Sequence, residues 1–82
     1  MNKNFNTMAR KKVYKLHDKV YCRAFKQKRL YLMYGEIVSI RNKDKEDEFY
    51  VIEDKHGDKY NVKYDDLYKN YDDMIDDERN YL

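Results

Sequence analysis

The sequence predicts a small, mainly β domain that ends in one α-helix, and three observations lead to this prediction. Apolar and polar residues alternate over residues 20–25, which is the period of a half-buried strand. Two runs of β-branched and aromatic residues flank a turn that contains Gly57, which is typical of a hairpin. After Leu67 the apolar residues recur at helical spacing. A chain of 82 residues holds one hydrophobic core.

The chain begins with residues 1–12, which are predicted to form a flexible basic arm because they show little apolar periodicity. The cations of this arm are Arg10, Lys11 and Lys12. The folded domain is expected over residues 13–69 and an acidic helix over residues 70–82.

The first two predicted strands are separated by a basic break at residues 26–29. The residues expected to share one face of the first strand are Val20, Cys22 and Ala24. The second strand covers residues 30–40, and Gly35 permits a sharp bend or bulge within it. Because barrels need bent strands, this segment favours a barrel.

The second half of the sheet is predicted as a hairpin. A charged loop over residues 42–48 leads into a short strand over 48–53, rich in β-branched and aromatic residues. The turn at residues 55–58 then connects it to a last strand over residues 59–64.

A terminal helix is predicted from about Tyr71, with Asn70 as N-cap and Asp73 in an acidic first turn. Its apolar stripe consists of Leu67, Tyr71, Met74, Ile75 and Leu82. Its outer face carries two like-charge i,i+4 pairs, Asp72 with Asp76 and Asp73 with Asp77. Each such pair is destabilising, so a basic surface is expected to offset them. That surface is either the basic half of the same chain or an external basic partner.

Charge is segregated along the chain. Residues 1–43 hold twelve Lys and Arg against two acidic residues, a net charge of +10, whereas residues 44–82 hold six against fourteen, a net charge of −8. Segregation of this kind indicates a charged partner or an internal electrostatic closure.

Composition excludes several classes of protein. No apolar run is long enough to cross a membrane, and the N-terminus lacks the apolar stretch of a signal peptide. Cys22 is the only cysteine, which excludes an internal disulfide framework. We therefore expect an intracellular protein, cytoplasmic, or nuclear if the source is eukaryotic. Heavy use of Lys, Asn, Asp and Tyr is typical of AT-rich genomes, including those of phages.

Catalytic chemistry is not expected. The candidate nucleophiles are Ser39 within an apolar strand, Thr7 in the arm, and Cys22 on the predicted buried face. His17 and His56 lie far apart in sequence without a companion at metal-ligand spacing. The sequence therefore predicts a non-enzymatic protein without a metal or cofactor.

Several motifs occur in the order typical of one family of small barrels. They are Val20-Tyr21-Cys22, Gly35-Glu36-Ile37-Val38-Ser39-Ile40, Tyr50-Val51-Ile52-Glu53-Asp54 and Tyr60-Asn61-Val62. Over residues 16–68 the chain resembles a Tudor domain, in the order of elements seen in Polycomb-like proteins, and SH3-like barrels more generally. The resemblance implies a five-stranded, strongly bent antiparallel barrel that binds ligands at one open end.

Methyl-lysine readers of this family hold the ammonium group in an aromatic cage. At the cage positions this chain has Phe25, Met33 or Tyr34, Ile52 and Tyr60, of which only Tyr60 matches the pattern plainly. Phe25, Tyr34 and Tyr60 would form a partial cage if a longer first loop moved Phe25 into place. A methyl-lysine or methyl-arginine reader is therefore one hypothesis.

Nucleic-acid binding, preferably of a single strand or RNA, is the main functional hypothesis, because cations interleaved with aromatic residues suit phosphate neutralisation and base stacking. The candidate cations are Arg10, Lys11, Lys12, Arg23, Lys26, Lys28, Arg29, Arg41 and Lys43, and the candidate aromatic residues are Tyr21, Phe25, Tyr31, Tyr34 and Tyr60. The alternative is a protein-interaction module, such as an adaptor or a small phage inhibitor of a host protein. In that case an acidic helix with Asp72, Asp73, Asp76 and Asp77 would face a basic partner, and the chain would be a monomer or a homodimer.

Overall fold

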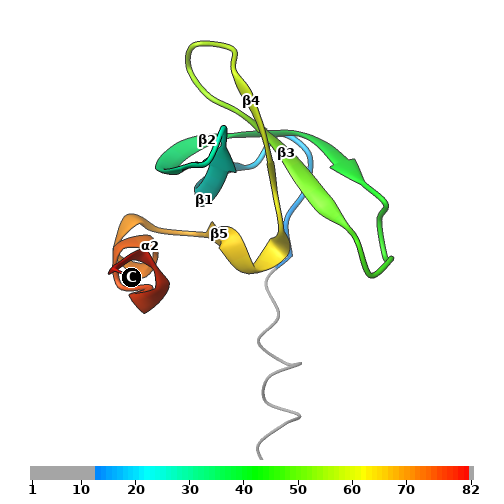
Figure 1. Cartoon of the computed structure of the whole chain (residues 1–82). Helices are drawn as coiled ribbons and strands as arrows, with labels where there is room; N and C mark the ends of the chain where they lie inside the picture. The colour runs from blue at the N-terminus through cyan, green and yellow to red at the C-terminus, as the bar shows by residue number, and fades with distance from the viewer. Residues whose placement is uncertain (1–12, 82) are drawn as a thin grey trace, which may run out of the picture.

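The computed structural model describes residues 13–81, and the side chains of residues 13–80, as one five-stranded antiparallel sheet with a small helical segment at its C-terminal end (Figure 1). The strands are β1 (Lys19–Lys26), β2 (Arg29–Arg41), β3 (Phe49–Glu53), β4 (Lys59–Val62) and β5 (Leu67–Tyr68). A 3₁₀ turn, η1 (Tyr64–Asp66), precedes β5, and helix α2 (Tyr71–Ile75) and a second 3₁₀ turn, η2 (Glu78–Tyr81), follow it. The predicted arm over residues 1–12 lies outside the described residues.

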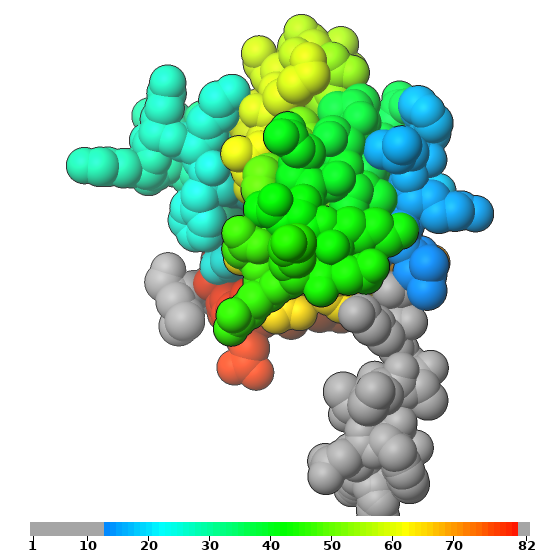
Figure 2. Space-filling view, turned by 90° about the vertical axis from the view of Figure 1, so that its right-hand side faces the viewer, coloured from blue at the N-terminus to red at the C-terminus, as the bar shows by residue number. Residues whose placement is uncertain are grey.

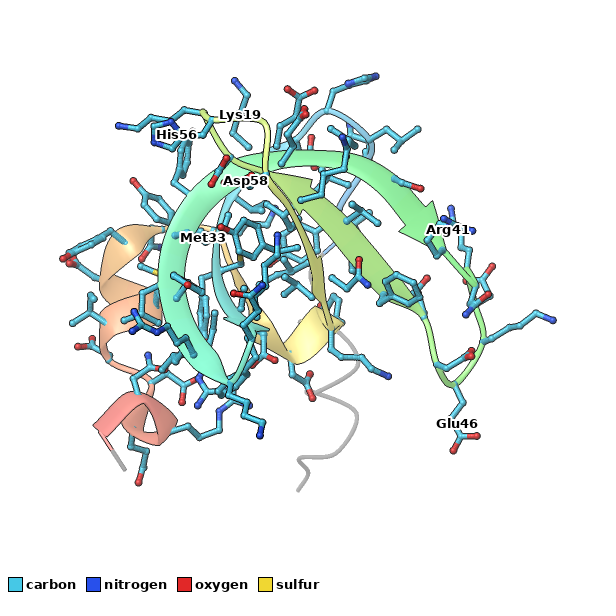
Figure 3. The ribbon with its side chains drawn as sticks, turned by 45° about the horizontal axis from the view of Figure 1, so that its top comes forward. Lys19, Met33, Arg41, Glu46, His56 and Asp58 are labelled. Atoms are coloured by element: carbon cyan, nitrogen blue, oxygen red, sulfur yellow. The ribbon has the colours of Figure 1, made fainter. Side chains whose placement is uncertain are left out.

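The strands follow the spatial order β4-β3-β2-β1-β5. Strand β2 curves through the middle of the sheet (Figure 3), so that residues 29–36 pair with β1 and residues 36–41 pair with β3. The register shifts between Ile37 and Ser39, close to the glycine predicted to allow a bend. A Cβ atom on Gly35 would lie 2.5 Å from the Glu53 carbonyl oxygen, so only glycine permits this close approach of β2 and β3. The mainly β, five-stranded prediction is confirmed. Over residues 13–81 the hydrogen-bonded order ends at β4 and β5, which leaves the sheet open.

The core lies on one face of this curved sheet. It consists of Tyr14, Val20, Cys22, Ala24, Ile37, Tyr50, Ile52, Val62 and Leu67. Val20, Cys22 and Ala24 are at most 2% exposed, which confirms the face predicted for the first strand. Tyr14 packs edge-on against Tyr50, because the segment before β1 folds back over the core.

The break between the first two strands is tighter than expected. Gln27 and Lys28 have φ values of 54° and 66°, and Lys26 pairs directly with Arg29. Two consecutive residues with positive φ make a two-residue hairpin turn, whose twist matches that of the strands. The expected longer first loop is therefore wrong, and the basic residues form the end of a regular β1–β2 hairpin.

The C-terminal helix is shorter than predicted. The Asn70 side chain accepts a hydrogen bond from the Asp73 amide at 2.9 Å, which confirms the N-cap, but α2 ends at Ile75. The predicted continuation of the helix beyond Ile75 is wrong over the described residues, because Asp77 turns away to bind Arg79, and residue 82 lies outside them. Asp73 and Asp77 are consequently not an i,i+4 pair of one helix.

None of the helices in the described part of the chain is long and apolar enough to span a membrane. Within residues 13–81 no three His, Cys, Asp or Glu side chains gather as metal ligands would.

Candidate functional site

The β1–β2 hairpin is the most prominent projection of the described chain. In the space-filling view its residues extend from one side of the molecule (Figure 2, cyan). Successive residues of a strand point to opposite faces, so the hairpin has two faces of different composition. The inner face is the one that it shares with the buried Val20 and Ala24, and the outer face is the opposite one.

Cations and aromatic rings meet on the inner face near the hairpin turn. The Lys26 ammonium lies 4.7 Å from the centre of the Tyr60 ring and donates a hydrogen bond of 3.3 Å to the Lys59 carbonyl. Tyr31 packs against Tyr60 with ring centres 5.8 Å apart. Arg29 pairs with Lys26 and therefore shares its face. We call Lys26, Arg29, Tyr31 and Tyr60 the tip site.

The tip site is open to solvent and carries positive charge. Tyr31 is 36% exposed, and both Lys26 and Arg29 are exposed. Partial desolvation, followed by the charges of Asp54 and Asp58, raises the pKa of the Tyr60 phenol, so this ring stays uncharged at neutral pH. A neutral ring beside a lysine ammonium suits both stacking and phosphate binding. Lys28 lies at the turn itself, between the two faces.

The outer face of the hairpin is mainly apolar, with Arg23 between Tyr21 and Phe25, and the Arg23 guanidinium lies 5.3 Å from the centre of the Phe25 ring. Tyr21 packs against Tyr34 at 4.6 Å between ring centres and against Tyr71 of α2 at 5.9 Å. The exposed members of this face are Phe25 (59%), Leu30 (37%), Leu32 (40%), Tyr34 (50%) and, beside them, Tyr71 (56%). We call these five residues the outer stripe.

Arg23 was predicted to bind nucleic acid, but its side chain is directed to the C-terminal segment. Its guanidinium donates hydrogen bonds to Asn80 Oδ1 at 2.6 Å and to the Arg79 carbonyl at 3.2 Å, and it lies 3.7 Å from Asp66. Only 11% of this side chain is exposed. Arg23 therefore holds the C-terminal segment against β1.

The acidic residues near the C-terminus divide into two groups. The Asp77 carboxylate accepts hydrogen bonds from the Arg79 guanidinium, at 2.6 Å from Nη2, and from the Tyr68 hydroxyl. These donors hold the pKa of Asp77 well below its usual range. Arg79 also pairs with Asp66 at 2.9 Å within the acidic half, and Arg23 of the basic half lies 3.7 Å from the same carboxylate, so part of the charge segregation closes internally. The exposed carboxylates are those of Asp72, Asp73, Asp76 and Glu78.

The remaining predicted cations do not join the tip site. Arg41 and Lys43 follow the opposite end of β2, where Figure 3 shows Arg41 on the far side of the molecule from α2. They border the loop at residues 42–48, which also contains four acidic residues. The arm cations Arg10, Lys11 and Lys12 lie outside the described residues.

The predicted partial cage does not form. Phe25 and Tyr34 belong to the outer face of the hairpin, whereas Tyr60 packs on the inner side. The tight turn at Gln27 and Lys28 fixes this separation, because it leaves no loop that could carry Phe25 across.

Two further side chains that were considered as reactive groups, those of Cys22 and His17, make contacts within the fold. Burial, with a smaller contribution from Asp66, raises the pKa of the Cys22 thiol to about 12, so the thiol stays protonated at neutral pH. His17 lies 2.8 Å from a Glu36 carboxylate oxygen on the surface, at the opposite end of the hairpin from its turn.

Sequence reasoning placed Phe25 and Tyr34 on an aromatic binding surface, but it missed the apolar stripe that they form with leucines of β2, and it missed the pairing of Arg79. The signal for the stripe was present, because residues 30–34 are five consecutive large apolar residues and so are apolar on both faces of a strand. No comparable signal marks Arg79, whose partner Asp66 lies thirteen positions away in sequence.

Comparison of the chain with protein-family models, with curated proteins and with solved structures finds no match.

Proposed function

We propose that the protein is a non-enzymatic binding module with an SH3-like, Tudor-like barrel, and that it binds single-stranded nucleic acid at the tip site. The observation that supports this most directly is the Lys26 ammonium over the Tyr60 ring, with Tyr31 packed beside it. Stacking rings next to cations are what an unpaired, negatively charged strand requires.

The barrel is supported by the course of the chain. Strand β2 bends so that its two ends belong to different halves of the sheet, and the 3₁₀ turn η1 brings β5 back to pair with β1. One core fills the concave side. A ligand at the tip site would lie at the mouth between the hairpin and β4, where the resemblance to small barrels places ligands.

The position of the acidic helix favours this site over others. Tyr71 at the start of α2 contacts the outer face through Tyr21, and the exposed carboxylates of Asp72 and Asp73 follow it. Figure 3 shows the hairpin between α2 and β4, so the tip site opens on the side away from these carboxylates. Phosphate groups at the tip site are therefore separated from the acidic helix by the hairpin.

The test is fluorescence anisotropy with labelled single-stranded DNA and RNA of about 15 nucleotides and with a matched duplex. We expect the single strand to bind more tightly than the duplex. For the two cations of the tip site, the logarithm of affinity should fall with the logarithm of salt concentration with a slope of about −1.4. Tyr60→Ala should weaken binding about tenfold, in line with the loss of one stacked base.

Lys45→Gln is the matched control, because it removes an exposed lysine from the loop at residues 42–48, far from the tip site. Lys26→Gln should lower affinity and reduce the salt slope by about 0.7, whereas Lys45→Gln should change neither. The absence of binding at about 50 mM salt, or equal effects of the two lysine variants, would refute the proposal.

A second candidate function, protein interaction, is favoured by the outer stripe. Its residues present large apolar side chains next to an acidic helix. This combination repels phosphate groups and suits contact with another protein. Binding of a protein there leaves the tip site free, so the two functions are compatible.

A further inference from the structure

We propose that the outer stripe is the interface of a symmetric homodimer, in which the occupant is the outer stripe of a second copy of this chain. The stripe is a separate surface from the tip site, so this inference does not depend on nucleic-acid binding. Three properties of the described residues support a second copy as the occupant: apolar spacing, charge complementarity and the small size of the sheet.

The apolar spacing is symmetric about Leu32. Leu30, Leu32 and Tyr34 alternate along β2 with their side chains on the outer face, over about 13 Å of strand. A two-fold axis through Leu32 places this residue against its own counterpart and places Leu30 of each copy against Tyr34 of the other. Such self-complementarity is what an isologous dimer interface requires.

Charge complementarity distinguishes a second copy from an unrelated partner. The stripe ends at the hairpin turn with the exposed Lys28, and at its other end Tyr71 leads into the exposed Asp72 and Asp73. Within the described residues none of these three charges belongs to an ion pair. The same two-fold axis brings the cationic end of one copy to the acidic end of the other, so this contact between opposite charges occurs at both ends of the interface.

The size of the sheet is consistent with this arrangement. At its base the inner side of the hairpin is covered by the core, whereas the outer stripe has five large side chains that are 37–59% exposed. A domain of this size buries a smaller fraction of its surface on folding than a large domain does, so a second copy adds apolar burial that one chain cannot provide.

The primary test is the mass of the full chain in solution, measured by sedimentation velocity over a range of concentrations. We expect a dimer at micromolar concentration that Leu32→Arg converts to a monomer with unchanged circular dichroism. Lys45→Glu, an exposed charge change in the loop at residues 42–48, should leave the dimer intact. A wild-type chain that stays monomeric to millimolar concentration overturns the proposal and leaves the stripe to another protein or to residues 1–12.

A cross-linking test locates the axis. Leu32→Cys should form a disulfide-linked dimer under mild oxidation, because the two introduced thiols would face each other. The background is low, since the native Cys22 is 0% exposed. Lys45→Cys provides an equally exposed thiol away from the axis. Equal cross-linking of the two variants would show that the dimer, if present, does not use Leu32.

A charge exchange tests the orientation. Lys28→Glu alone, or Asp72→Lys with Asp73→Lys, should each raise the dimer dissociation constant about tenfold, because like charges then face each other at both ends of the interface. An equimolar mixture of the two variants should regain wild-type affinity as a mixed dimer. Failure of the mixture to recover would overturn the two-fold arrangement. The Leu32→Arg monomer should still bind oligonucleotides, so the two proposals fail separately.

Discussion

The two halves of β2 contain similar apolar side chains and bury them to very different extents. In residues 36–41 the strand pairs with β3, and the segment before β1 binds Ile37 through its backbone on the other side, so Ile37 is fully buried. In residues 29–35 the strand pairs with β1 alone, and even Tyr31, on the same face as Ile37, remains 36% exposed. Leu32 lies on the opposite, outer face, which none of the described strands covers, and is 40% exposed. Neighbouring elements, and not the hydrophobicity of the residue, therefore decide which side chains form the core.

The largest expected effect lies in the buried half. Ile37→Ala should lower the free energy of unfolding by about 3 kcal/mol, because it leaves a cavity among tightly packed neighbours. Urea denaturation followed by circular dichroism measures this difference. Val38→Ala, one position along the strand and partly exposed, is the control and should cost less than half as much. A loss below about 1 kcal/mol for Ile37→Ala would show that this half is not the centre of the core.

An effect of intermediate size on folding stability is expected from a rise in pH. It arises at the base of the hairpin, where the inner face of the hairpin is part of the core. Cys22 pairs with Met33 of β2, and burial raises its pKa from 9.0 to about 12. The pKa of Tyr68, mainly through burial and its hydrogen bond to Asp77, rises from 10.0 to about 12. Because both groups bind protons more tightly in the folded state, their contribution to stability is complete below pH 9 and is lost as the pH rises to about 12.

Thermal denaturation between pH 7 and pH 11 measures this loss. The melting temperature should be level near neutrality and fall from about pH 9 upward. The Cys22→Ala variant keeps a small apolar residue and removes the first titration, so its melting temperature should begin to fall about one pH unit later. An identical onset in both proteins would assign the alkaline loss to tyrosines alone.

Much of the sheet was predictable because local rules and tertiary packing agree. Alternation identified the buried face of β1, and Gly57, with a φ of 85°, forms the turn predicted between β3 and β4. The N-cap at Asn70 follows from the same kind of local chemistry. In each case the residue type by itself favours the conformation that the fold requires.

The features that were not predictable depend on contacts between distant residues or on unusual residues in a turn. Gln27 and Lys28 adopt positive φ although neither is a typical residue for that conformation, so the sequence suggested a loop. Helix α2 ends early because Asp77 meets Arg79 and Tyr68, a contact that helical periodicity does not reveal. Of the predicted site, Lys26, Arg29, Tyr31 and Tyr60 come together, but Arg23 does not, because its partners are Asn80 and Asp66.

The smallest expected effect concerns the outer half of β2. Leu32→Ala should change the unfolding free energy of the dissociated monomer by about 0.5 kcal/mol, because the side chain is only partly removed from water within one chain. Urea denaturation at low protein concentration, where a dimer dissociates, measures this value. At high concentration the same substitution should cost more, because burial between two copies then adds to the stability of the wild-type chain.

Comparing the two concentrations separates two explanations of the apolar run at residues 30–34. If Leu32→Ala is as costly as Ile37→Ala even in dilute protein, the outer stripe is core that a single chain needs for folding. If its cost is small in dilute protein and grows with concentration, the stripe is an interface between copies. In the second case the apolar residues of β2 are divided between folding and association. Those that fold the monomer are buried by its own strands, and those that join two copies remain exposed until the copies meet.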